Sequence, residues 1–81
     1  MSHSARYNNA FIECFDLSEK DLSSDLKYQS IKNWDSVGHM VLIARLEEDF
    51  GIMLEMDDII DFSSFDEGKQ ILKKYGIELD K

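Results

Sequence analysis

Residues 35–51, "DSVGHMVLIARLEEDFG", decide the fold predicted for this chain. Asp35 and Ser36 are both good N-cap residues, and Gly51 is a typical C-cap, so the boundaries of a helix over residues 36–50 are marked at both ends. At about 100° per residue, apolar side chains gather on one face of this helix. We expect that face to pack on the core through Leu42, Ile43, Leu46 and Phe50, with His39 at its edge.

The segment before this helix predicts a first helix and a long ordered connection. Residues 5–15 place Phe11, Ile12 and Phe15 on one face, and Ser2 or Ser4 can cap that helix. Residues 16–35 contain "SEKDL", whose serine and aspartate have capping-box spacing and predict one helical turn over residues 18–22. Apolar residues recur often enough to hold the connection on the core: Leu17, Leu22, Leu26, Tyr28 and Ile31.

The segment after it predicts two more helices. The stretch "MDDIID" at residues 56–61 favours a short third helix with solvated carboxylates that offset the helix dipole. Ser64 is the expected cap of a last helix that ends at Gly76 and faces inward through Ile71, Leu72 and Tyr75. We therefore predict a single domain, residues 1–81, with an all-α fold. It is a small four-helix bundle of three longer helices and one short third helix, with a long ordered loop between helices 1 and 2.

Charge and composition limit the classes of partner. Of 81 residues, 17 are acidic and 9 are basic, which gives a net charge of −8. Nucleic acid is therefore not an expected partner, because its binding depends on cations that neutralise phosphates, whereas an acidic surface suits basic patches on other proteins. No apolar run approaches the roughly 18 residues of a membrane span. We expect a monomer with no membrane span.

The cysteine and histidine content points to a reducing compartment and to no metal site. The single cysteine, Cys14, cannot form an internal disulfide, and the N-terminus shows no signal-peptide pattern, so we expect a cytoplasmic protein. Cys14 lies among large apolar residues and is expected to be a buried small hydrophobe. His3 and His39 have no carboxylate or cysteine at metal-ligand spacing, so no metal is expected.

A second stripe runs along the helix over residues 36–50. Val37, Val41 and Ala44 share an arc with Glu48, and Glu47 lies near its margin. A helix that only covered a core would carry polar residues at positions 37 and 41. Two interpretations remain open: either the long loop covers this stripe, or the stripe is a docking surface edged by carboxylates.

Two potential caps in tandem raise the question of what Ser36 does. If Asp35 caps the helix, the Ser36 hydroxyl is free to point outward at the positive end of the helix dipole, where a phosphodiester is favoured. Gly38 would then leave space for that approach. The alternative is that Ser36 is only a helix cap, in a non-catalytic helical protein-interaction module.

Several motifs together resemble the acyl carrier protein family and its peptidyl carrier relatives. They are "DSV" opening a helix that ends in "RLEEDFGI", the leucine-bounded "DLSEKDL", the acidic turn before a short helix, and the paired hydroxyls that open the last helix. The resemblance covers nearly the whole chain. It implies that Ser36 carries a 4′-phosphopantetheine, derived from coenzyme A, whose thiol holds an acyl or aminoacyl group as a thioester. The protein would be a carrier and not an enzyme.

The resemblance also implies partners. Asp35 would help a phosphopantetheinyl transferase to engage, and the family's partner-recognition helix matches Val37, Val41, Ala44, Glu47 and Glu48. The other implied partners are an acyl- or aminoacyl-activating ligase and acyl-transferring or condensing enzymes. "YQSIKNWDS" lacks the aspartate-leucine-glycine run of fatty-acid carriers, and "WDSVGHM" is more similar to free-standing carriers of specialised pathways. Fatty acid biosynthesis is therefore less expected than a specialised, secondary-metabolite pathway.

Three further interpretations depend on packing. Ser36 and His39 could form a small hydrolytic site, but no third group is expected to orient the histidine. Met40, Met53 and Met56 either line a pliable cavity or belong to the core. Trp34 either packs against the loop or marks a rim that partners touch.

Overall fold

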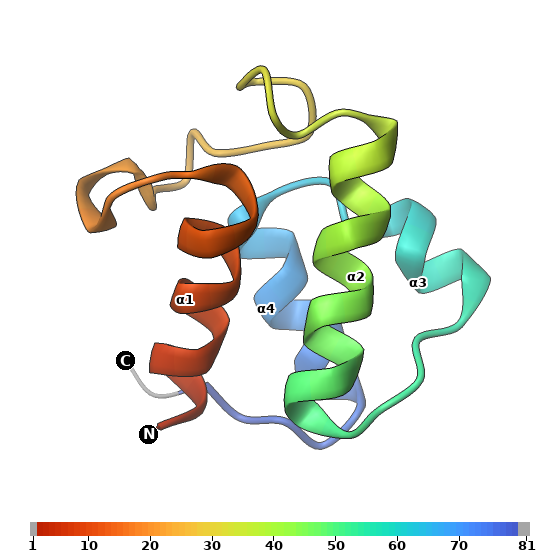
Figure 1. Cartoon of the computed structure of the whole chain (residues 1–81). Coiled ribbons are helices and arrows are strands. Elements are labelled where there is room, and N and C mark those ends of the chain that lie inside the picture. Colours follow the sequence, from red (N-terminus) through yellow and green to blue (C-terminus); the bar gives the residue numbers. More distant parts are fainter. Residues whose placement is uncertain (1, 80–81) are drawn as a thin grey trace.

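The computed structural model describes residues 2–79 and contains, in that range, four α-helices and one short 3₁₀ helix. They are α1 (His3–Phe15), η1 (Glu19–Asp21), α2 (Ser36–Phe50), α3 (Met56–Asp61) and α4 (Phe65–Lys74). In Figure 1, α1 and α2 lie side by side, α4 runs behind them, and the long connection between α1 and α2 crosses one end of the molecule. No β-strand forms between residues 2 and 79, and a small all-α fold is therefore confirmed.

Local capping sets the helix boundaries. The Asp35 carboxylate accepts a hydrogen bond from the Gly38 N–H at 2.8 Å, and Gly51 adopts the left-handed φ of 63° that ends α2, so both predicted boundaries of this helix are confirmed. Helix α1 begins at His3, earlier than the predicted residue 5, because Ser2 is its N-cap and accepts from the Ala5 N–H at 3.1 Å.

The core is built around aromatic rings. The ring of Phe11 has five aromatic neighbours with centroids 5.0 to 6.3 Å away, namely Tyr7, Phe15, Trp34, Phe62 and Phe65. Trp34 is fully buried and stacks on Phe15, so it packs inside the molecule and does not form a rim. Helix α2 adds the predicted face, with Leu42, Ile43 and Leu46 buried, Phe50 half-buried and His39 half-buried at the edge.

The long connection is an ordered segment that is tied to the far end of the chain. Leu26 is buried, and its carbonyl accepts from the Phe65 N–H at 2.8 Å, next to an isolated antiparallel bridge between Lys27 and Ser64. The predicted helical turn is present as η1, and the other predicted anchors pack partly buried against the core: Leu17, Leu22, Tyr28 and Ile31.

Helices α3 and α4 are joined by a buried carboxylate. Asp58 accepts from the Lys74 ammonium at 2.6 Å and from the Tyr75 hydroxyl at 2.5 Å. These two hydrogen bonds, that of Lys74 first, hold the pKa of Asp58 below its ordinary value. The prediction of solvated carboxylates in α3 is therefore wrong for Asp58, which is 5% exposed, while Asp57 and Asp61 are exposed.

Cys14 and Arg45 lie at the contact between α1 and α2. Cys14 is half-buried, so the prediction of a buried residue is correct only in part, and desolvation raises the pKa of its thiol. The Arg45 guanidinium contacts the carboxylates of Glu13 at 2.7 Å and Asp49 at 2.8 Å. This pairing joins α1 to α2.

Candidate functional site at the start of helix α2

The Ser36 hydroxyl lies exposed at the first residue of α2. Because the Asp35 carboxylate supplies the cap, the Ser36 side chain is not needed for the amides of the first turn. Its Oγ lies 3.0 Å from the hydroxyl oxygen of Tyr28, in the long connection. The predicted division of labour, with Asp35 as the cap and the Ser36 hydroxyl facing outward, is present in the structure.

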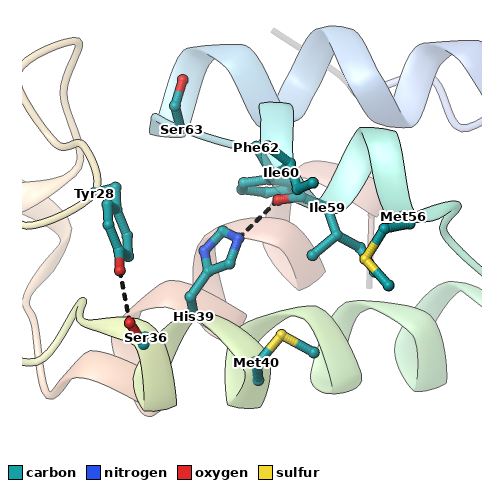
Figure 2. A pocket seen from close by; sticks show the side chains of 9 residues that line it. All are labelled: Tyr28, Ser36, His39, Met40, Met56, Ile59, Ile60, Phe62 and Ser63. Atoms are coloured by element: carbon teal, nitrogen blue, oxygen red, sulfur yellow. Dashed lines mark hydrogen bonds between the residues drawn. The ribbon is translucent and has the colours of Figure 1, made fainter.

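An apolar pocket of about 370 Å³ opens directly beside Ser36, between α2 and α3 (Figure 2). Tyr28 and Ser36 stand at one end of it, and Met40 and Met56 at the other. The pocket is lined by Tyr28, Ser36, His39, Met40, Met56, Ile59, Ile60, Phe62 and Ser63. The serine hydroxyl therefore has an apolar surface within reach, which the sequence indicated only through its methionines.

His39 is held by two hydrogen bonds that fix its tautomer. The Trp34 indole N–H donates to Nδ1 at 2.9 Å, and Nε2 lies 2.8 Å from the Ile59 carbonyl oxygen. An indole nitrogen can only donate and a carbonyl can only accept, so Nδ1 is the acceptor and Nε2–H is the donor. The expectation that no group orients His39 is wrong. Both ring nitrogens are already bonded, however, so His39 in this arrangement cannot take a proton from Ser36, and a hydrolytic pair is not supported.

Gly38 is required by packing. A Cβ atom at this position would collide with the backbone carbonyl of Asn33 and would lie 3.3 Å from the Phe15 ring. The Asn33 amide in turn donates to the Phe15 carbonyl at 3.0 Å, which fixes the chain just before α2. The interpretation that Gly38 clears an approach to Ser36 is therefore wrong, since the space it leaves is filled from inside the protein.

The second stripe of α2 is uncovered. The side chains of Val37 and Val41 are 73% and 51% exposed, and Ala44 and Glu48 are also exposed, so the interpretation that the long loop covers the stripe is wrong. Met40 is 53% exposed and follows Val37 by three residues, which places it on the same face. The stripe therefore continues through Met40 into the pocket beside Ser36.

Glu47 differs from the rest of the stripe. Its carboxylate accepts from the Leu54 N–H at 2.9 Å, and the residue is half-buried. Glu47 therefore holds the connection between α2 and α3, while Glu48 is left as the exposed acid of the stripe.

Met40, Met53 and Met56 do not belong to the core. Met53 and Met56 are 82% and 70% exposed, and Met40 is also exposed. The interpretation as plain core is wrong for all three. Met40 and Met56 line the pocket, whereas Met53 is not among its lining residues.

The described part of the chain contains neither a metal-binding cluster nor a membrane-spanning helix. Among residues 2–79, no three His, Cys, Asp or Glu side chains are grouped so that they could hold a metal ion. Within the same residues, no helix combines the length and the apolar character needed to cross a bilayer. Comparisons with models of known protein families, with curated protein sequences and with solved structures gave no match.

Proposed function

We propose that this protein is a free-standing acyl carrier protein in which Ser36 carries a 4′-phosphopantetheine. The observation that carries the proposal is the exposed Ser36 hydroxyl at the N-terminus of α2, left available because Asp35 caps the helix. The attached group supplies a thiol that holds an acyl or aminoacyl group as a thioester. The chain is on this proposal a carrier and not an enzyme, a cytoplasmic monomer, and its helices form the four-helix bundle of that family.

The residues around Ser36 fit such a group. A phosphodiester at this position is an anion at the positive end of α2, where the helix dipole and the amides of the first turn favour negative charge. The negative charge of Asp35 opposes this effect, but its carboxylate is engaged by the Gly38 N–H. The pocket beside Ser36 offers the apolar side chains of Met40 and Ile59 to the pantetheine arm that is attached to the phosphate.

In the attachment step the Ser36 hydroxyl is the nucleophile. The Ser36 Oγ forms a bond to the β-phosphorus of coenzyme A, the bond from that phosphorus to the oxygen of 3′,5′-ADP breaks, and the hydroxyl proton leaves to a base. Because both nitrogens of His39 are bonded to Trp34 and Ile59, this chain does not offer His39 as the base. We propose that the phosphopantetheinyl transferase supplies the base.

The exposed stripe of α2 suits transient contact with partner enzymes. Val37, Met40 and Val41 form an apolar strip that begins one residue after the attachment site and is flanked by Glu48. A small apolar strip on a chain of net charge −8 favours fast, electrostatically guided encounters with basic surfaces. We propose that it receives the transferase, the acyl- or aminoacyl-activating ligase and the acyl-transferring or condensing enzymes.

Intact-mass measurement tests the proposal. The purified chain is incubated with coenzyme A, Mg²⁺ and a broad-specificity phosphopantetheinyl transferase. We expect wild type to gain the mass of one phosphopantetheinyl group and Ser36→Ala to gain nothing. Ser63→Ala is the matched control, because Ser63 is also an exposed serine that lines the same pocket, and it should gain the same mass as wild type.

The interaction-module alternative gives the opposite result. The cap in α2 is Asp35 and not Ser36, so the part of this alternative that makes Ser36 the cap is wrong. If the chain is nevertheless an interaction module with no group on Ser36, wild type gains no mass although it is folded. The exposed stripe of α2 would then be the functional surface, and Ser36 would have no role in function.

A further inference from the structure

The Tyr28 side chain contacts Ser36, and three parts of the molecule hold it. Its backbone N–H donates to the Ser63 carbonyl at 2.9 Å, between α3 and α4. Its ring meets the imidazole of His39 edge to face, with centroids 5.5 Å apart. Its hydroxyl oxygen lies 3.0 Å from the Ser36 Oγ. The position of the phenol is therefore set by the long connection, by α2 and by the α3–α4 connection together.

Backbone hydrogen bonds hold the chain on both sides of Tyr28, and none of them involves the Ser36 side chain. The Gln29 N–H donates to the Trp34 carbonyl at 2.9 Å, and Gln29 has a left-handed φ of 66°, so the chain turns sharply between these residues. The Leu26 carbonyl on the other side accepts from Phe65. A hydroxyl held in this way is pre-organised, so little conformational freedom is lost when it binds a group next to Ser36.

Modification of Ser36 would change which oxygen donates in this contact. In the unmodified protein either hydroxyl can donate to the other. Once Ser36 Oγ is part of a phosphodiester it has no hydrogen, so Tyr28 O–H supplies the hydrogen of the contact. The non-bridging phosphate oxygens carry the negative charge and lie one bond beyond the phosphorus that is joined to Oγ. A hydroxyl that donates to an ionised oxygen makes a shorter and stronger bond than one between neutral groups.

We infer that Tyr28 is the positioning residue for the phosphodiester on Ser36, an inference that rests on the proposed function. The Tyr28 hydroxyl donates to the phosphodiester and holds it at the end of the pocket where Figure 2 shows Tyr28 and Ser36 together. From this end the pocket extends toward Met40 and Met56, whose apolar side chains would be within reach of the arm. Val37, the neighbour of Ser36 on the exposed face, is a hydrocarbon side chain and offers no competing hydrogen bond.

The test compares two phenol deletions. Tyr28→Phe removes only the hydroxyl that faces Ser36, and keeps the ring against His39. Tyr75→Phe is the matched control, because it removes an equivalent hydroxyl that instead binds Asp58 and the Glu55 N–H. Wild type and both variants are modified with coenzyme A, and the single phosphodiester is observed by ³¹P NMR in folded and in urea-unfolded protein.

A second readout follows the arm itself. Each protein is modified with a coenzyme A analogue that carries a fluorophore on its thiol, so that the thiol of Cys14 is not labelled, and the anisotropy is measured. We expect Tyr28→Phe to move the ³¹P resonance toward its urea-unfolded position and to lower the anisotropy. Tyr75→Phe should lower thermal stability and leave both readouts at their wild-type values.

The outcomes separate the two proposals. Wild type that gains no phosphopantetheinyl mass overturns the carrier function, and the role of Tyr28 falls with it. If wild type is modified, and Tyr28→Phe has the same ³¹P position and the same anisotropy as wild type, only the role of Tyr28 is overturned. Equal changes in Tyr28→Phe and Tyr75→Phe also overturn it, because they would show a general loosening of the fold.

Discussion

Replacing Asp35 and Ser36 separately by alanine should have very different effects on stability. The Asp35 carboxylate caps α2 through the Gly38 N–H at 2.8 Å. Loss of an N-cap costs about 0.5 to 2 kcal/mol, and loss of a negative charge at a helix N-terminus costs about 0.3 to 1 kcal/mol more. We therefore expect Asp35→Ala to lower the free energy of unfolding by about 1 to 3 kcal/mol. For a domain of this size, each kcal/mol corresponds to a fall of about 4 to 8 °C in Tm.

Ser36→Ala should be close to neutral. Its hydroxyl makes one exposed hydrogen bond, to Tyr28, and water can replace that partner. Alanine is also the better helix former at this first position of α2, by a few tenths of a kcal/mol. We expect a net change within about 0.5 kcal/mol, the range of ordinary surface substitutions.

Thermal unfolding of the unmodified proteins, followed by circular dichroism, measures both effects. Asp35→Asn is the control, because asparagine is an equally good N-cap without the charge, and it should lose only the electrostatic part. A loss in Ser36→Ala as large as that in Asp35→Ala would refute the reasoning. Ser36 would then be the structural cap, and its hydroxyl would not be available for modification.

Three further predictions concern packing, pH and the exposed stripe. Gly38→Ala should lower the free energy of unfolding, measured by urea titration, by about 1 to 2 kcal/mol, because the collision with the Asn33 carbonyl outweighs the gain in helix propensity. A variant more stable than wild type would contradict this prediction. Because the pKa of Asp58 is lowered in the folded protein, its ionised carboxylate contributes stability above the unfolded pKa of about 3.9, and this stability is lost as pH falls through the folded pKa. The difference in urea midpoint between wild type and Asp58→Asn should therefore be present at pH 7 and shrink on acidification. A difference that stays constant with pH would contradict this prediction. Val41→Asp should leave Tm nearly unchanged and raise the KM of the transferase, whereas Met53→Asp, at an exposed site outside α2, should leave that KM unchanged.

The parts of the fold that depend on nearby residues could be predicted from the sequence. The boundaries of α2 follow from Asp35 and Gly51, which act within one turn of the helix ends. That Asp35 is the N-cap and leaves the Ser36 hydroxyl free was one of two predicted alternatives, because capping depends only on residues next to the helix end. The start of α1 was missed by two residues because Ser2 and Ser4 are both acceptable caps, and the sequence does not choose between them.

The features that were missed depend on contacts between distant segments. The burial of Asp58 requires Lys74 and Tyr75 from another helix, and the hydrogen bond from His39 to Ile59 links α2 to α3. No helical periodicity reports such contacts. Met40 is the exception: it follows Val37 by three residues, so helical spacing could have placed it on the exposed stripe, but the predicted stripe did not include it.

The most direct measurement locates the added group in the chain. Protein produced together with a phosphopantetheinyl transferase is digested, and its peptides are sequenced by tandem mass spectrometry with conditions that retain phosphodiesters. If this protein is a carrier, the phosphopantetheinyl mass is found on Ser36 and on no other serine. Complete coverage of an unmodified Ser36, with the protein folded and the transferase active on a known carrier, would contradict the central claim.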